Sequence, residues 1–416
     1  MYHPTRVRLF VFITIIVLLF AATAFFIIRT PKDTASELAY LRSANSSQKD
    51  VEHFFEVVAK EKGGVYAYDL LRQAPFLNVD THEVGHVIGD VLYKQKGIQG
   101  IHYCTHEFRN ACSHSIVIHF FIEHGEAGVS QAIAACQNIP GFGNYLQCFH
   151  ALGHGMLASQ GYDLPKTAAF CTTVGTPEFD YKETKECIGG TIMELIGGGA
   201  HDPDLWKKKR AQYVTVTDPL RPCSDDFIPA IAKKRCYVYL TPHLFWSAGL
   251  RAFDPAINFS TAFSFCSKLS TTDLASRSGC YGGFGKEFLS FIQQGDVRKS
   301  GHESDADLAQ LHTWCGQAGT IEGTTSCVIN TLESLYWDGK NSHLTAINFC
   351  ELSAHPVTRS ACFLNIIALT FTYVTDRAQL ERVCADIPDD FKKECNSHFI
   401  PIPLSKESEP VSKKTL

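Results

Sequence analysis

Residues 129–161 read VSQAIAACQNIPGFGNYLQCFHALGHGMLASQG and contain one complete copy of the unit from which the chain is built. The first eight residues place apolar side chains three and four positions apart, as one face of a helix requires. A polar loop with proline and glycine separates Cys136 from Cys148, and a longer apolar segment then runs to Gly161. Glycine is typical just beyond a helix C-terminus. The unit therefore consists of helix A, cysteine, loop, cysteine and helix B.

The spacing of the cysteines indicates that this unit repeats along the chain. All sixteen fall into eight successive pairs separated by 8 to 16 residues, and four of the seven gaps between pairs are 22 to 24 residues long. The even count and regular spacing predict a ladder of local disulfides in an internal repeat. The alternative is a scatter of buried free thiols. The predicted pairs are Cys104 with Cys112, Cys136 with Cys148, Cys171 with Cys187, Cys223 with Cys236, Cys266 with Cys280, Cys315 with Cys327, Cys350 with Cys362 and Cys384 with Cys395.

Two short helices cannot bury their apolar faces alone, so neighbouring units must stack. We therefore predict an all-α fold of disulfide-stapled helix pairs, forming a right-handed or gently curved α-solenoid with one continuous core. A further copy without cysteines lies upstream at residues 79–93, VDTHEVGHVIGDVLY, with Asp80 at the position of Cys148. In architecture, residues 97–398 resemble the cysteine-rich tetratricopeptide-like repeat proteins that bacteria secrete. That resemblance implies stacked helix pairs with one disulfide each, and it implies no particular ligand.

The N-terminal residues indicate a membrane protein. Leu9 to Ile28 is a run of twenty residues without a charge, enough for a helix of about 30 Å that crosses a bilayer. Arg6 and Arg8 precede the run, which favours a cytoplasmic N-terminus. The rest of the chain would then lie in the periplasm or outside the cell, where disulfides persist. The alternative is a signal peptide cleaved near Ala22-Thr23-Ala24.

We therefore predict a single-pass membrane protein in four parts. They are an N-terminal anchor (1–30), a stalk (31–48), an extracytoplasmic helical repeat domain (49–400) and a disordered tail (401–416). A net charge of −5 and a pI near 6.4 give no electrostatic case for binding nucleic acid. The expected partners are the membrane, through the N-terminal helix, and a protein on the solenoid surface.

The histidines suggest a metal site. Nine of the eighteen lie between residues 82 and 154, and the form His-x-x-Gly-His occurs twice, at His82/His86 and His150/His154. A separation of four places both imidazoles on one helical face, which suits two ligands of one ion. His114 stands two residues after Cys112, as His150 does after Cys148, so three successive B helices present histidine at the same height.

These five residues, His82, His86, His114, His150 and His154, are the predicted ligands of a transition metal, with zinc the expected ion. His150 and His154 meet the first pair only if the solenoid curves tightly toward that face. Otherwise they form a second site with His114, or with Glu194 on the next B helix.

The first copy also reads His82-Glu83-Val84-Gly85-His86, and HEVGHVIG resembles the zincin superfamily of zinc peptidases over these eight residues. The resemblance implies that Glu83 is catalytic and activates a metal-bound water. The extended zincin pattern fails because Leu92 occupies its third ligand position, so His114 is the candidate third ligand. The second copy reads His-Ala-Leu-Gly-His, so the two copies do not share the glutamate.

The leading interpretation is a membrane-anchored, extracytoplasmic helical repeat protein with a histidine-lined transition-metal site. Repeats five to eight, where B-helix histidines are sparse, would then serve as scaffold and partner surface. One alternative is a zinc metallohydrolase of the His-Glu-x-x-His type. A second is a metal-free protein-interaction scaffold whose histidines pack in the core.

Overall fold

A computed structural model describes residues 34–43, 47–139, 142–199, 202–250, 257–336, 343–374 and 376–399. Over these residues the chain forms helices and no strand, which confirms the predicted all-α class. The chain divides into two compact units. Helix α2 (Ala35–Ser43) belongs to the first unit and lies within the segment predicted as a stalk. The second unit holds the remaining described helices, and the account below concerns that unit alone.

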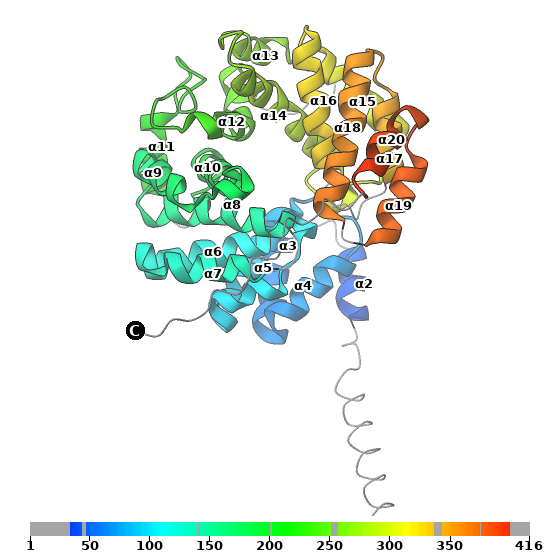
Figure 1. Ribbon diagram of the computed structural model, residues 1–416. Coiled ribbons are helices and arrows are strands. Elements are labelled where there is room, and N and C mark those ends of the chain that lie inside the picture. The colour runs from blue at the N-terminus through cyan, green and yellow to red at the C-terminus, as the bar shows by residue number, and fades with distance from the viewer. Residues whose placement is uncertain are drawn as a thin grey trace, which may run out of the picture. The chain divides into compact units, whose positions relative to one another are not determined.

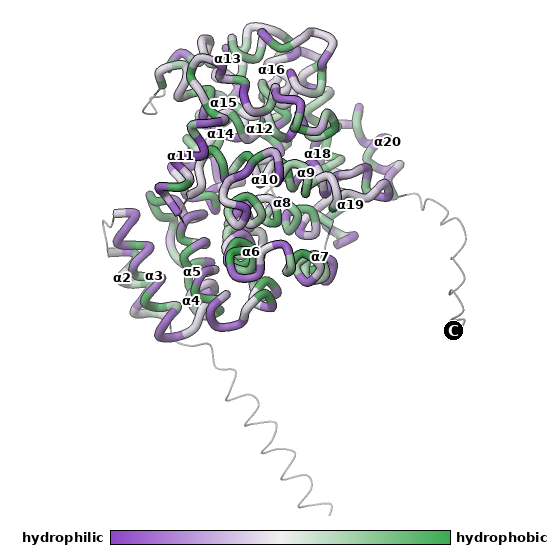
Figure 2. The backbone as a smooth tube through the Cα atoms, turned by 90° about the vertical axis from the view of Figure 1, so that its left-hand side faces the viewer, coloured by the Kyte–Doolittle hydropathy of each residue, from purple (hydrophilic) through white to green (hydrophobic). Residues whose placement is uncertain are grey.

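The predicted anchor, residues 1–30, and the predicted tail, residues 401–416, lie outside the described residues. Among the helices that are described, none combines the length and the apolar character that crossing a membrane requires. Figure 2 agrees, because the tube alternates between hydrophilic and hydrophobic colours along nearly every helix.

All eight predicted disulfides form, with Cα–Cα distances of 5.4 to 5.6 Å, and no described cysteine is free. The disulfide ladder is therefore confirmed at every predicted position. The first cysteines are Cys104, Cys136, Cys171, Cys223, Cys266, Cys315, Cys350 and Cys384. Their partners, in the same order, are Cys112, Cys148, Cys187, Cys236, Cys280, Cys327, Cys362 and Cys395.

In the described part of the chain, six A helices carry the first cysteine of a pair. They are α7 (Val129–Gln137), α9 (Leu164–Val174), α13 (Ser260–Cys266), α15 (Asp305–Gly316), α17 (His343–Glu351) and α19 (Arg377–Asp386). Every second cysteine lies on a B helix. The B helices are α6 (Ala111–His124), α8 (Phe142–Ser159), α10 (Lys182–Gly197), α12 (Lys233–Ser247), α14 (Leu274–Gln293), α16 (Ile321–Leu335), α18 (Pro356–Tyr373) and α20 (Asp389–Ser397).

Two repeats depart from the predicted helix pair. Cys104 follows a 3-10 helix, and Cys223 lies in a turn after an insertion that contains α11 (Pro203–Tyr213). The copy without cysteines is α5 (Thr81–Lys96), which follows α3 (Gln48–Lys62) and α4 (Gly64–Gln73). The 3-10 helices are η1 (Gly97–Tyr103), η2 (His106–Phe108), η3 (Gly125–Gly128), η4 (Pro177–Phe179), η5 (Ala230–Ala232) and η6 (Val297–Lys299).

Each B helix packs on the next, from α5 to α6 and on to α18. Glycines allow this close approach. A Cβ atom at Gly153 on α8 would overlap the carbonyl oxygen of Cys187, and one at Gly190 on α10 would overlap the carbonyl oxygen of His150. The helix backbones are therefore in direct contact, which a larger side chain would prevent. Gly153 directly precedes His154. The His-x-x-Gly-His pattern predicts that another helix packs closely at this glycine, as it does here.

The stack curves far more than a gently curved solenoid, so that part of the prediction is wrong. The segment after α14 returns to the start of α5, where buried Asp296 accepts hydrogen bonds from the Leu77 amide (2.7 Å) and the Thr81 hydroxyl (3.3 Å). Helix α18 also reaches α8. Glycine contacts such as those at Gly153 and Gly190 let neighbouring B helices approach closely along this curved stack. Figure 1 shows the B helices from α5 to α16 following one another around a curve. Residues on these helices line one cavity of about 610 Å³.

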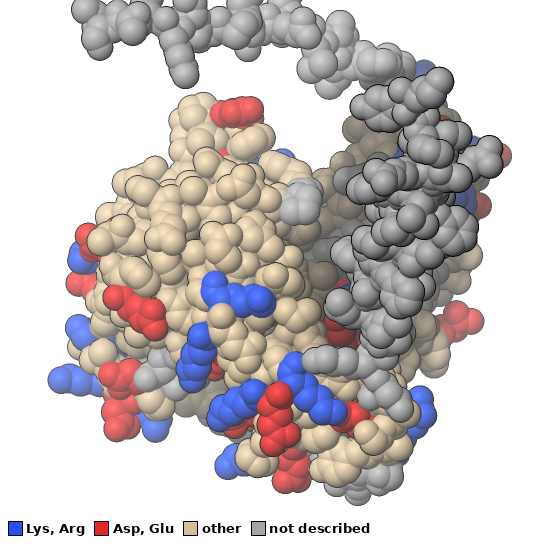
Figure 3. Space-filling view, turned by 90° about the horizontal axis from the view of Figure 1, so that it is seen from below, with Lys and Arg blue, Asp and Glu red and all other residues tan. Residues whose placement is uncertain are grey.

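The surface carries mixed charge. On the face shown in Figure 3, basic and acidic side chains lie beside one another and do not gather into a basic surface. This distribution agrees with the small net negative charge of the chain.

Candidate metal centre

The first histidine pair lies on α5, whose N-terminus is capped by Asp80. The Asp80 carboxylate accepts hydrogen bonds from the His82 and Glu83 amides, at 2.9 and 3.3 Å. The Nδ1 of His82 lies 2.8 Å from the Phe108 carbonyl oxygen, so it donates and leaves Nε2 with a lone pair. That Nε2 lies 3.2 Å from Nε2 of His86. Two nitrogens bound to one tetrahedral zinc ion lie about 3.3 Å apart, so the pair already has ligand spacing.

The second pair on α8 repeats this geometry. His150 and His154 have their Nε2 atoms 3.2 Å apart. The Nδ1 of His154 lies 3.1 Å from Glu194 Oε2, again leaving Nε2 as the nitrogen with a lone pair. Glu194 is itself held by the Tyr162 hydroxyl (3.1 Å) and the Gly199 amide (2.9 Å). A carboxylate that fixes a histidine through its second nitrogen is typical of metal sites.

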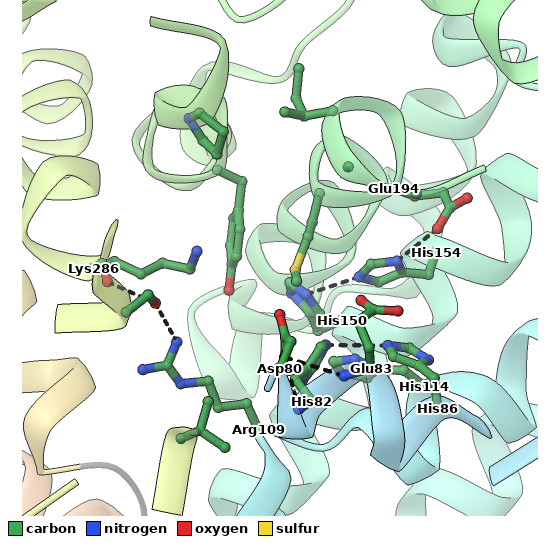
Figure 4. Close-up of a pocket in the computed structure, with 18 of the residues that line it drawn as sticks. Asp80, His82, Glu83, His86, Arg109, His114, His150, His154, Glu194 and Lys286 are labelled. Atoms are coloured by element: carbon green, nitrogen blue, oxygen red, sulfur yellow. Dashed lines mark hydrogen bonds and ion pairs between the residues drawn. The ribbon is translucent and has the colours of Figure 1, made fainter. Parts of the chain in front are cut away.

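His114 on α6 lies between the two pairs (Figure 4). Its ring centroid is 5.7 and 5.9 Å from those of His82 and His86, and 5.2 and 5.1 Å from those of His150 and His154. One nitrogen from each of His82, His86 and His114 lies within 4.8 Å of the others. The tight curvature of the stack therefore brings all five histidines together. Ile118, which stands in place of a second histidine on α6, lines the same cavity.

The His114 side chain has no hydrogen-bond partner among the described residues. Only 2% of the residue is exposed, and neither Nδ1 nor Nε2 is hydrogen-bonded. Both polar atoms of one buried ring are thus unsatisfied, whereas buried polar groups in folded proteins are paired in the large majority of cases.

Burial sets the charge state of the cluster. It lowers the pKa of His82, His114 and His150 well below the ordinary value, so these rings are neutral at neutral pH. Neutral imidazole is the form that binds metal. Burial, and then the nearby Asp80 carboxylate, raises the pKa of Glu83 to about 7. Glu83 lines the cavity beside the histidines (Figure 4), so the first pair has as its neighbour a carboxyl group that can exchange protons near neutral pH.

A second wall of the cavity carries the cations Arg109, Arg235 and Lys286 together with the carboxylates Glu287 and Glu333. Arg109 donates to two neutral oxygens, Ser290 Oγ (3.0 Å) and Gln293 Oε1 (3.2 Å), whereas Arg235 is paired with Glu186 and Lys286 with Glu287. Tyr239 joins this wall to the histidines.

The Tyr239 ring centroid lies 4.9 Å from that of His150 and 5.3 Å from Lys286 Nζ. Lys286 and the histidine cluster therefore share Tyr239 as a neighbour.

We did not predict this wall from the sequence, although a signal was present. His154 is the sixth residue after the second cysteine of its repeat, and the residues at the same position in five other repeats also line the cavity. They are Ile118, Met193, Pro242, Lys286 and Glu333. Helices α14 and α16 belong to repeats expected to serve as scaffold and partner surface, and in the structure they also line the cavity.

No protein-family model, no curated protein and no solved structure matches this chain. The function is therefore inferred from the cavity and its side chains.

Proposed function

We propose that this protein binds a transition-metal ion, with zinc the expected ion and His82, His86 and His114 its ligands. The observation that carries the proposal is the unsatisfied ring of His114. A metal-free core explains the contact within each pair, because each 3.2 Å contact also fits an N–H···N hydrogen bond. It does not explain His114, because leaving one buried polar group unpaired costs about 1–3 kcal/mol. A metal ion gives the ring a partner.

The site has the features of a catalytic metal centre. Structural zinc sites are closed by four protein ligands, whereas catalytic sites use three and keep a position open. Here three histidines face a cavity of about 610 Å³, and eight disulfides already cross-link the fold. We therefore propose metal-dependent chemistry on a small molecule that enters the cavity. Arg109, which donates to the neutral oxygens of Ser290 and Gln293, is the proposed contact for a negatively charged group on that molecule, in a lining that also carries six carboxyl groups.

Hydrolysis is the reaction with specific support. Glu83 lies between the two proposed ligands of α5 and lines the same cavity, where loss of hydration raises the pKa of its carboxyl group to about 7. A general base works best when its pKa is close to the working pH. In this reaction Glu83 takes a proton from the attacking water, and the metal supplies Lewis-acid activation of that water.

We also propose that the helical repeats lie outside the cytoplasm, with the apolar run Leu9 to Ile28 as their membrane anchor. The eight disulfides support this placement, because such bonds persist in oxidising compartments.

Metal analysis of the purified full-length chain tests the metal site. Prepared without chelators, the wild type should carry about one equivalent or more of a transition metal. The double variant His82→Ala/His86→Ala should lose the ion held by these two histidines while its circular dichroism stays helical. His124→Ala is the matched control, because His124 ends α6, packs on Phe120 and lies outside the cavity lining. A wild type with less than about a tenth of an equivalent would contradict the proposal and favour the metal-free scaffold.

Glu83→Gln separates metal binding from hydrolysis. The variant should keep its metal, because Glu83 is not among the proposed ligands, and should lose about 10²–10⁴-fold in hydrolytic rate. The assay would use zinc-loaded protein with a panel of esters, amides and phosphoesters that carry a negative charge. A hydrolytic rate equal to that of the wild type would exclude Glu83 as the base.

A further inference from the structure

The repeated geometry points to two metal ions in the cavity, bridged by the imidazole of His114. We infer that His82 and His86 bind the first ion, that His150 and His154 bind the second, and that His114 gives one ring nitrogen to each. This inference rests on the proposed function and adds a second ion to it.

The two pairs are equivalent as ligands. In each, two histidines one helical turn apart have Nε2 atoms 3.2 Å apart. In each, an oxygen accepts a hydrogen bond from one Nδ1, namely the Phe108 carbonyl for His82 and the Glu194 carboxylate for His154. Because these rings donate from Nδ1, their Nε2 lone pairs point at the partner histidine. Each pair therefore offers two facing Nε2 atoms, whereas among the described residues the cluster of three nitrogens within 4.8 Å of one another is formed by the first pair with His114.

The position of His114 links the pairs. Two imidazoles on one tetrahedral ion have ring centroids about 5 Å apart. The His114 ring centroid lies 5.7 and 5.9 Å from those of the first pair and 5.2 and 5.1 Å from those of the second. The His114 ring is stacked on that of His154 at 23°, so the second ion requires the His114 ring to turn until a nitrogen lone pair faces that ion. A single ion would satisfy one of its nitrogens and leave the other buried without a partner among the described residues. Two ions satisfy both.

Formation of the bridge releases one proton from the His114 ring. Neutral His114 binds the first ion through its unprotonated nitrogen. When the second ion binds, the remaining N–H proton leaves to solvent, and the ring becomes an imidazolate that donates a lone pair to each ion. The ions would lie about 6 Å apart, because each is about 2 Å from its ring nitrogen. Each ion then has three histidine nitrogens and an open position toward the cavity.

The first test counts ions in the full-length chain after reconstitution with Zn²⁺ and removal of excess metal. The wild type and the His124→Ala control should hold about two equivalents. His82→Ala/His86→Ala and His150→Ala/His154→Ala should each hold about one. One equivalent in the wild type, lost only in His82→Ala/His86→Ala, would overturn the second ion and leave the proposed function standing. No zinc in any form would overturn both.

The second test addresses the bridge. With two equivalents of Cu²⁺, the wild type should show the electron paramagnetic resonance signature of two exchange-coupled ions. His114→Ala should instead show isolated Cu²⁺ signals or fewer bound ions. Two uncoupled signals in the wild type would overturn the bridge. If His114→Ala fails to fold, the separation of two zinc ions in anomalous diffraction from the wild type decides, with about 6 Å expected.

Discussion

At the scale of single residues, the metal proposal depends on which nitrogen each histidine presents. Glu194 fixes this for His154, because its carboxylate accepts the Nδ1–H hydrogen bond and is held in place by Tyr162 and Gly199. Although burial acts to raise it, hydrogen bonds from His154 and other groups hold the pKa of Glu194 below its usual value. Glu194 is therefore an anion that orients His154, one of the proposed metal ligands.

Glu194→Gln should weaken zinc binding at the His150/His154 pair by about 10–100-fold, because the neutral amide orients the ring less firmly. Competition with a chromophoric chelator would measure this affinity. Glu123→Gln is the control, because Glu123 accepts a hydrogen bond from Tyr93 and does not line the cavity. Equal affinity in Glu194→Gln and the wild type would show that Glu194 does not orient a ligand.

At the scale of helices, the approach of α8 to α10 determines where His150 and His154 lie. A Cβ atom at Gly153 would meet the backbone of α10, which cannot move aside as a flexible side chain can. The same contact positions Glu194 relative to His154, since the two residues come from the two helices.

Gly153→Ala should therefore lower the free energy of unfolding by about 1–3 kcal/mol and weaken metal binding. Urea unfolding monitored by circular dichroism measures the first effect. Gly197→Ala on α10 is the matched control, because a Cβ there meets nothing within 4 Å. It should be neutral or stabilise the helix by up to about 1 kcal/mol. Equal stability of the two variants would contradict the close backbone contact.

At the scale of the whole second unit, Asp296 joins distant parts of the chain. It is fully buried, pairs with Arg298 at 2.6 Å and accepts hydrogen bonds from Leu77 and Thr81, which directly precede the first histidine pair. Asp296→Ala leaves these donors buried without an acceptor and should lower the free energy of unfolding by about 3–5 kcal/mol. Asp226→Ala, at an exposed site, should change it by less than about 0.5 kcal/mol. Similar urea unfolding midpoints for Asp296→Ala and Asp226→Ala would show that the curved stack does not need the contact of Asp296 with Leu77 and Thr81.

The disulfides also stabilise the whole second unit, although each one links two cysteines that are close together in the sequence. Replacing both Cys315 and Cys327 by alanine opens a loop of 12 residues and should lower the free energy of unfolding by about 3 kcal/mol. Peptide mapping of the non-reduced wild type should show eight links between neighbouring cysteines. A long-range link, such as one between Cys112 and Cys266, would contradict the repeat.

The local features could be predicted from the sequence. Helix pairs, cysteine partners and the common height of His82, His114 and His150 follow from spacings of a few residues, which helix geometry converts directly into positions. The glycine beside the second histidine of each pair likewise predicted close packing, and the structure confirms it at Gly153.

The convergence of the five histidines, by contrast, was decided only by the tertiary structure. It depends on curvature, which is the sum of small displacements at each contact between B helices and is stabilised by pairs such as Leu77 and Asp296, 219 residues apart. A local sequence pattern therefore cannot predict the total curvature. The sequence determined which side chains face inward from each helix. The packing of the helices decided that Arg109, Lys286 and Glu333 would share one cavity with the histidines, because those residues meet only when the stack has turned back on itself.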